Sequence, residues 1–353
     1  MWPSPSLFYP QPTTWGYNSR MTSVPLPAHL STSRHVRPLN VLRDLPRVAD
    51  LIELCFATNM DSEGQSYVRQ MRRASRDVSF MSWASNAIES ASLPLSGFVC
   101  EQNGRIIGNA SLVPFRHRGK RIYLIANVAT HPDYRRKGIA RVLTEQAMGL
   151  AYQRGADELW LHVRADNPGA VQMYADLGFV ERARRTTWRV NTDRHRNTFP
   201  FSRSDNARSL PAVTRRHSHF WPQQLAWLNQ LHPEELGWYR PFNWNSLKPG
   251  LWNWFYRLFI EFDLQQWAVQ KNGRLQGILA WMPTTHSSSL WLACNPDADS
   301  ESITSLLLSA HRDLIHRHSL ALEHPAGLQE QAIQAAGFNA SRTLIWMRSE
   351  GAT

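Results

Sequence analysis

Residues 128–141 read Val-Ala-Thr-His-Pro-Asp-Tyr-Arg-Arg-Lys-Gly-Ile-Ala-Arg, and they predict a strand, a turn and the start of a helix. The motif Arg135-x-x-Gly138-x-Ala140 runs along this turn. Small residues at the first turn of a helix let an anion approach the free backbone N–H groups, where the helix dipole adds about half a positive charge. Basic residues surround the same point and favour a pyrophosphate. They are Arg135, Arg136, Lys137 and Arg141.

The segments around this turn predict further elements in a regular order. Asn103-Gly104, flanked by apolar residues, predicts a tight hairpin upstream. From Arg136 onward, apolar residues recur at helical spacing until Gly155, which stands where a C-terminal cap belongs. Apolar residues then alternate over 159–163, which is typical of a half-buried strand. The order is therefore hairpin, strand, phosphate turn, helix and strand.

A second motif follows at Asn167-x-x-Ala170-x-x-x-Tyr174-x-x-x-Gly178-Phe179. Asn167 followed by proline predicts a helix start, with Asn as the cap and Pro at the first helical position. Each motif alone also occurs by chance, and the turn alone is equally typical of a solvated basic helix start. Together, in this order and on these elements, they resemble the two cofactor signatures of the GNAT superfamily of acyl-CoA-dependent N-acetyltransferases.

This resemblance covers about residues 36–190 and implies the fold class α/β (α+β), a mixed, mostly antiparallel sheet flanked by helices. It implies a splayed central strand pair, 128–130 and 159–163, with the pantetheine of acetyl-CoA, the co-substrate, in the wedge between them. The implied cofactor contacts are Val128, Ala129, Thr130, Arg135, Arg136, Lys137, Gly138, Ile139, Ala140, Arg141, Asn167 and Tyr174.

The resemblance also implies a catalytic role for Tyr174, which would give a proton to the departing CoA thiolate. A phenol with a pKa of about 10 suits a thiolate whose parent thiol has a pKa of about 8.5. The alternative for Tyr174 is a packing role beneath the sheet. Many relatives place a basic carboxylate on the first wedge strand, but the matching position here is Ala126, with Asn127 beside it. A water relay or another residue is therefore needed as the base.

The chain also contains an internal repeat. Residues 267–277 echo residues 98–108, including an identical Asn-Gly-Arg turn, and residues 292–297 echo residues 128–133. Repeats this long indicate a duplicated structural unit, so the sequence predicts two tandem GNAT-like domains. The expected divisions are a disordered leader over 1–35, a catalytic domain over 36–190, a linker over 191–216 and a second domain over 217–350.

The second copy lacks the residues that carry the chemistry in the first. Asp299 stands at the Arg135 position, Ser302 replaces the glycine of the turn, and Ile333 stands at the Tyr174 position. Three acidic residues in this turn repel a pyrophosphate. They are Asp297, Asp299 and Glu301. We therefore expect a degenerate domain that supports the first one or shapes the acceptor cleft.

Charge and cysteine content indicate which classes of partner and which cellular compartment to expect. The formal net charge is +11, and nearly all of the basic excess lies in residues 1–200. CoA accounts for part of it, and an acidic acceptor, nucleic acid or a solvated surface could account for the rest. Three widely spaced cysteines favour reduced, buried thiols in a cytoplasmic protein.

Two further clusters do not add a site. His311, His316 and His318 lie close in sequence, but no cysteine or carboxylate pattern completes a metal site, so we expect no metal. The aromatic run over 252–259 favours a core or a seam between domains over an acceptor pocket or a base-stacking surface. This run is too short and interrupted for a membrane span.

The sequence therefore predicts an acetyl-CoA-dependent N-acetyltransferase of tandem architecture, active in its first copy, with a small-molecule or peptide amine as acceptor. Two alternatives stay open. The missing carboxylate at Ala126 favours a non-catalytic acyl-CoA-binding or sensor protein, and the basic first half favours acylation of RNA or a ribosomal protein.

Overall fold

The computed structural model describes residues 34–57, 60, 62–74, 96–191, 210–240, 242–249, 264–283, 288–315 and 319–351. Nearly all of the expected leader, most of the expected linker and the aromatic run at 252–259 lie outside the described residues. The chain forms two compact units, Met1–Phe115 with Tyr123–Asp157, and Arg116–Ile122 with Glu158–Thr353.

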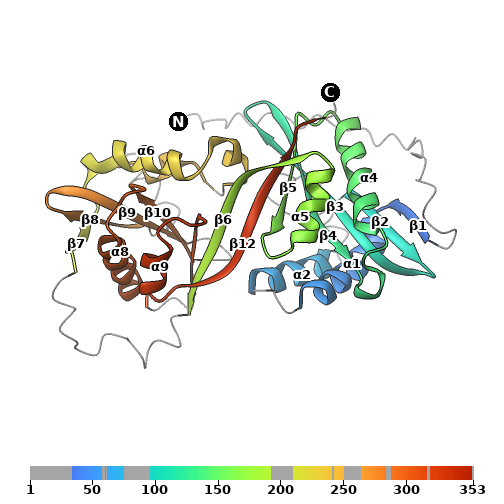
Figure 1. Ribbon diagram of the computed structural model, residues 1–353, viewed down its shortest axis with the longest axis horizontal. Helices are drawn as coiled ribbons and strands as arrows, with labels where there is room; N and C mark the ends of the chain where they lie inside the picture. The colour runs from blue at the N-terminus through green and yellow to red at the C-terminus, as the bar shows by residue number, and fades with distance from the viewer. Residues whose placement is uncertain are drawn as a thin grey trace, which may run out of the picture. The chain divides into compact units, whose positions relative to one another are not determined.

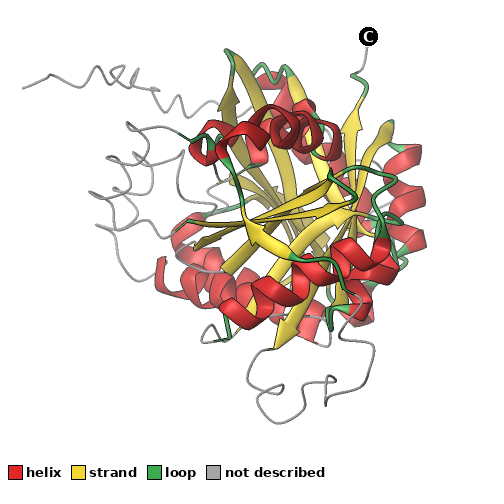
Figure 2. Ribbon diagram, turned by 90° about the vertical axis from the view of Figure 1, so that its left-hand side faces the viewer, coloured by secondary structure: helices red, strands yellow, loops and turns green. Residues whose placement is uncertain are grey.

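The first unit is a sheet with helices on both faces (Figure 1), and Figure 2 shows the helices of the molecule in red and its strands in yellow. Its strands lie in the order β1-β2-β3-β4, and β2 is antiparallel to both β1 and β3. These strands are β1 (Arg34–Pro38), β2 (Ser96–Gln102), most of β3 (Arg105–His117) and most of β4 (Lys120–Thr130). The helices are α1 (Val41–Phe56), α2 (Ser62–Ala74) and α4 (Ile139–Gln153).

The two faces of this sheet are covered in different ways. On one face, Leu45 and Val48 of α1 pack against Val99 of β2 in a fully buried cluster. On the other face, Gly108 of β3 lets α4 approach closely, because a Cβ atom at this position would lie 2.6 Å from Cγ2 of Ile139. Burial of apolar side chains on both faces fixes the position of β4, whose end carries the phosphate turn.

Both predicted Asn-Gly hairpins are confirmed. Asn103 and Gly104 have φ values of 51° and 75°, and Asn272 and Gly273 have φ values of 53° and 73°. Two successive positive φ values match the twist of the flanking strands, and Asn and Gly are the residues that adopt them most readily. The same short-range signal therefore produces the same turn in both copies.

The second unit has the strand order β5-β12-β6-β11-β10-β9-β8-β7. Its strands are β5 (Glu158–Arg164), β6 (Phe179–Asn191), β7 (Val213–Arg215), β8 (Gln265–Lys271), β9 (Arg274–Pro283), β10 (Ser288–Cys294), β11 (Ser319–Pro325) and β12 (Asn339–Ser349). Its helices are α5 (Pro168–Asp176), α6 (Trp221–Leu231), α8 (Ser300–Asp313) and α9 (Glu330–Ala335).

Strand β9 shows how this unit divides its core. Ile278 and Ala280 belong to the cluster that contains Leu228 of α6, whereas Leu279 belongs to the cluster that contains Leu306 of α8. Successive side chains of a strand point to opposite faces, so one apolar strand serves both helices. Figure 1 shows α6 on one side of β8–β10 and α8 and α9 on the other.

The duplicated order of elements confirms the predicted tandem fold. A hairpin, a strand, a helix, a strand, a short helix and a final strand occur first as β2–β6 and again as β8–β12. The final strand of each copy, however, pairs with strands of the other copy. Strand β12 pairs antiparallel with both β5 and β6, and β6 pairs with β11. The domain boundaries expected near residues 190 and 217 stay a prediction.

Strand β5 is buried on both faces, which differs from the predicted half-buried strand. Leu159, Trp160 and Leu161 are each 1% exposed or less. The Trp160 ring packs against Trp238, with ring centroids 6.0 Å apart, so the face expected to meet water is covered.

Among the helices of the described residues, none is both long and apolar enough to cross a membrane.

Candidate functional site

The phosphate turn connects the end of β4 with the start of α4. Strand β4 ends at Thr130, a short 3₁₀ turn spans Pro132–Tyr134, and α4 begins at Ile139. We expected the helix from Arg136, and that start is wrong. Arg136 and Gly138 have φ values of 62° and 76°, and left-handed backbone cannot belong to an α-helix.

The N-terminus of α4 has no side-chain cap. Gly138 occupies the N-cap position and has no side chain that could accept hydrogen bonds from the first turn. The first backbone N–H groups of a helix have no partner within the helix, so they remain available to an anion. A Cβ atom at Gly138 would have no heavy atom within 4 Å, which leaves open space over the turn.

Four basic residues lie within the turn and the first turn of α4. All four are exposed or half-buried: Arg135, Arg136, Lys137 and Arg141. Lys137 Nζ donates to the carbonyl of Asp133 at 3.1 Å, and Arg135 Nε donates to the carbonyl of Thr130 at 3.4 Å. Neither Arg135 nor Arg136 forms an ion pair with a carboxylate of the described residues. The turn is therefore a cationic cradle whose basic side chains have N–H groups left to donate to an anion.

The last residues of β4 lead into this cradle. Ala129 is buried in the α1 cluster, and Val128 and Thr130 are half-buried. The Cys55 thiol of α1 donates to the carbonyl of Thr130 at 3.2 Å. Burial raises the pKa of Cys55, so this group stays a protonated thiol. Its hydrogen bond holds the backbone next to the phosphate turn.

A partly buried polar network, which sequence reasoning missed, lies one residue beyond Ala126. Asn127 has a φ of 53° in the middle of β4, a conformation that Asn adopts more readily than most residues. Asn109 Nδ2 donates to the Asn127 carbonyl at 2.8 Å, and Asn127 Nδ2 donates to the Tyr67 hydroxyl at 2.7 Å. These bonds join β3, β4 and α2. The signal in the sequence was an asparagine inside an apolar strand.

Helix α5 of the second unit carries the other two predicted site residues. Asn167 is its N-cap, and its side-chain oxygen accepts from the Ala170 N–H at 3.2 Å. Tyr174 is 5% exposed, and its ring meets Phe179 edge to face at 6.2 Å. Burial raises the pKa of Tyr174 above its ordinary value, so the phenol stays protonated at neutral pH. The cap and the buried ring give both residues structural roles, and their cofactor-binding and catalytic roles stay predictions.

In the second copy, a side chain caps the N-terminus of the corresponding helix, α8. Asp299 is the N-cap of α8, and its Oδ2 accepts from both the backbone N–H and the hydroxyl of Ser302 at 3.0 Å. Lys271 Nζ lies 2.9 Å from Asp299 Oδ1. Ile333, at the Tyr174 position, is fully buried and apolar. A carboxylate of the chain itself therefore occupies the place that an anion would take.

The histidines do not form a metal site within the described residues. His311 is 4% exposed in α8, and His316 and His318 lie outside the described part. No group of three or more potential metal-ligating side chains occurs among the described residues.

Comparison with known proteins finds a match to one family over part of the chain. Residues 60–179 match the family described as acetyltransferase (GNAT). Over 67 residues, 19% of this chain and 45% of the relative, the chain is 42% identical to the ribosomal protein bS18-alanine N-acetyltransferase of Escherichia coli strain K12. Over 99 residues, 28% of this chain and 66% of the relative, it is 35% identical to N-alpha-acetyltransferase 30 of Schizosaccharomyces pombe. The first of these matches spans about half the length of the relative.

One solved structure shares the fold over most of the chain. A GCN5-related N-acetyltransferase from Sphaerobacter thermophilus superposes with a TM-score of 0.54 and 13% identity, covering 92% of this chain and 96% of that one. At this identity the likeness shows the fold alone.

Proposed function

Because residues 60–179 match the acetyltransferase (GNAT) family, we propose that this chain transfers an acetyl group from acetyl-CoA to a primary amine. The observation that carries the proposal is the uncapped N-terminus of α4 at Gly138, with uncompensated guanidinium groups beside it. A pyrophosphate needs this combination of free N–H groups and positive charge. The residues of the turn therefore fit the cofactor.

In this proposal the chain has one active site. Backbone N–H groups from Arg136 to Ala140 hold the pyrophosphate, and the backbone of Val128–Thr130 holds the pantetheine. Asn167 contributes to cofactor binding, as the resemblance implies. The second copy holds no acetyl-CoA, because Asp299 already occupies the N-terminus of α8.

Transfer forms a C–N bond between the amine and the acetyl carbon and breaks the C–S bond of the thioester. Tyr174 returns a proton to the departing thiolate; burial raises its pKa, which keeps the phenol protonated at neutral pH but makes it a weaker acid than a free tyrosine. The amine must lose a proton, and Ala126 offers no base. The polar groups nearest in sequence are those of Asn127, bonded to Tyr67. Neither is basic, so we assign the proton to a water relay that passes it from this network to the solvent.

For the acceptor we propose the α-amine at the N-terminus of a polypeptide in the cytoplasm. The relatives named for a ribosomal-protein alanine and for N-alpha acetylation support this class. Acylation of RNA and non-catalytic acyl-CoA binding are the competing functions. Salt-sensitive binding to RNA would support the first, and acetyl-CoA binding without turnover would support the second.

The test combines calorimetry with peptide acetylation. Wild type should bind acetyl-CoA with a stoichiometry of one, and Gly138→Glu should abolish binding because a carboxylate would occupy the phosphate turn. Ser300→Glu is the matched control, since it adds a carboxylate at the exposed first turn of α8. Ala-initiated peptides should gain one acetyl group by mass spectrometry. Absence of acetyl-CoA binding to wild type would refute the proposed function.

A further inference from the structure

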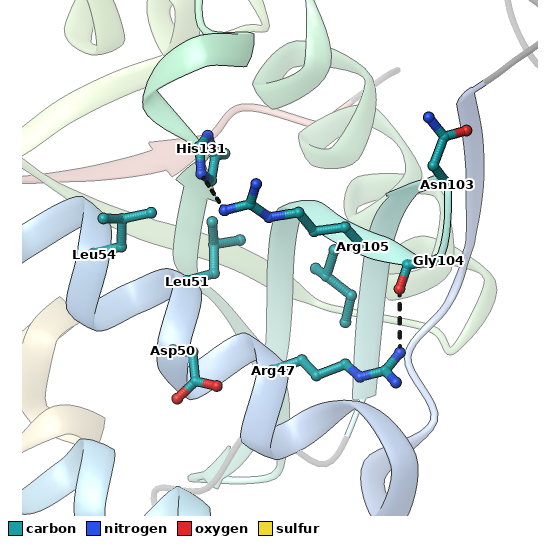
Figure 3. A pocket seen from close by; sticks show the side chains of 9 residues that line it. Arg47, Asp50, Leu51, Leu54, Asn103, Gly104, Arg105 and His131 are labelled. Atoms are coloured by element: carbon teal, nitrogen blue, oxygen red, sulfur yellow. Dashed lines mark hydrogen bonds between the residues drawn. The ribbon is translucent and has the colours of Figure 1, made fainter.

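A cavity of about 430 Å³ opens in the first unit between α1 and the β2–β3 hairpin, and Figure 3 shows the side chains that line it. Arg47 and Asp50 come from α1, Arg105 from the start of β3, and His131 from the residue after β4. Below, the arginine pocket means the cavity framed by Arg47, Arg105 and His131. It belongs to none of the contacts implied by the family resemblance.

The pocket carries positive charge without a carboxylate partner. Arg47 Nη1 donates weakly to the carbonyl of Gly104 at 3.4 Å, and Arg105 Nη2 lies 2.8 Å from His131 Nε2 (Figure 3). Among the described residues, neither guanidinium forms an ion pair. The nearby Asp50 carboxylate is taken by Arg72, whose Nη2 lies 2.6 Å away. Each guanidinium has five N–H donors, so most of them remain available.

His131 joins this pocket to the phosphate turn. Arg105 Nη2 lies 2.8 Å from His131 Nε2, and the other ring nitrogen, Nδ1, lies 3.3 Å from the backbone nitrogen of Asp133. His131 Nδ1 is 3.7 Å from Asp133 Oδ2, and the ring meets Tyr134 edge to face at 5.6 Å. His131 is 6% exposed, so its orientation is fixed by packing. Arg105 is thereby held at the same edge of the sheet as the cradle at Gly138.

Resting on the proposed function, we propose that the arginine pocket binds the phosphate monoester on the 3′ carbon of the CoA ribose. CoA carries this dianion a short distance from its pyrophosphate, so a cofactor anchored at α4 brings a second anionic group to the same edge of the sheet. Planar guanidinium groups match phosphate oxygens in geometry and charge. Leu54, 49% exposed at the rim, offers an apolar surface to the adjoining purine ring.

The repeat supplies a matched control. Arg274 follows the Asn272-Gly273 turn just as Arg105 follows Asn103-Gly104, so the two arginines start equivalent strands. Only Arg105 lines the arginine pocket. Arg274→Gln therefore removes the same charge from the same hairpin position without touching the pocket.

The experiment compares CoA with 3′-dephospho-CoA, which differs by this one phosphate. Dissociation constants are measured by calorimetry at fixed ionic strength for wild type, Arg47→Gln, Arg105→Gln and Arg274→Gln. We expect wild type to bind CoA at least tenfold more tightly than it binds 3′-dephospho-CoA. Loss of one charged hydrogen bond should weaken CoA binding by about tenfold in either pocket variant, with little change for dephospho-CoA. Arg274→Gln should behave as wild type.

Other outcomes separate the proposed acetyltransferase function from the proposed phosphate site in the arginine pocket. If wild type binds neither ligand, the proposed function fails. If wild type binds both ligands equally, or if the pocket variants retain the full preference for CoA, the phosphate site is refuted while the acetyltransferase proposal stands. A rise in KM for the peptide acceptor with unchanged CoA preference would assign the pocket to an acidic acceptor and would also overturn the inference. Thermal unfolding of each variant confirms that it is folded.

Discussion

The carboxylate of Asp299 accepts hydrogen bonds from both the backbone N–H and the hydroxyl of Ser302, each at 3.0 Å. This contact closes the N-terminus of α8 with a negative charge of the chain itself. The equivalent helix α4 begins at Gly138, which has no such group. Two copies of one turn thus differ at the point where a phosphate would bind, and the difference is local and testable.

Replacement of this cap should lower stability without affecting the cofactor. Asp299→Ala removes the side-chain acceptor of α8, and loss of an Asp cap costs about 1 kcal/mol in free energy of unfolding. Urea denaturation of the full chain measures this loss. Acetyl-CoA affinity should stay at the wild-type value, and a tighter or second binding event in Asp299→Ala would show that the second copy retains a latent site.

Gly138→Ala should weaken acetyl-CoA binding by about tenfold or more, since it adds a methyl group at the N-cap, next to the free N–H groups of α4. The backbone φ of 76° costs a non-glycine residue about 1 kcal/mol in stability as well. Gly337→Ala is the control, because Gly337 has a φ of 86° and equally open surroundings. Equal loss of affinity in both variants would mean that strain, and not the phosphate turn, is responsible.

Tyr174→Phe should lower kcat by about a hundredfold and leave the KM for acetyl-CoA nearly unchanged. Phenylalanine preserves the edge-to-face contact with Phe179, so the fold should survive. Steady-state kinetics at neutral pH measure the effect, and Tyr152→Phe on α4 controls for loss of a hydroxyl elsewhere. Full activity in Tyr174→Phe would leave this residue with the packing role alone.

His324 should make the second unit sensitive to acid. It is 0% exposed, and neither ring nitrogen has a hydrogen-bond partner among the described residues. Burial, followed by the charge of Arg185, lowers its pKa from 6.5 to about 3. Below pH 6.5 the unfolded chain takes up a proton that the folded chain does not, so stability falls as pH decreases from 6.5 towards 3.

The comparison with His324→Leu isolates this contribution. One proton changes the free energy of unfolding by about 1.4 kcal/mol per pH unit. Relative to His324→Leu, wild type should therefore lose about that amount of free energy of unfolding for each pH unit below pH 6. Denaturant titrations between pH 5 and 7.5 measure the shift. His35→Leu replaces an exposed histidine and should follow wild type. A gap that does not vary with pH would contradict the prediction.

Several features were predictable because their signals are local. Asn103-Gly104 and Asn272-Gly273 specify their turns through backbone preference, and Asn167 caps α5 through a contact three residues away. The start of α4 was predicted three residues early. Arginine fits the periodic pattern of the helix, and nothing in that pattern reveals the left-handed φ at Arg136.

Contacts distant in sequence could not be predicted. Asn127 meets Tyr67 across 60 residues, and Arg105 meets His131 across 26. Each residue alone is typical of a solvated or half-buried position. Their pairing depends on which strand edges and helix faces meet, and burial of apolar surface decides that for the whole unit.

The sequence by itself determined that the chain repeats one α/β plan, that the turn at Gly138 suits an anion, and that the turn at Asp299 does not, because turns, caps and charges act over a few residues. Only the tertiary structure decided that β12 lies between β5 and β6 and that two arginines share a pocket with His131. Strand order and shared cavities arise from hydrogen bonding and packing between segments that no local pattern connects.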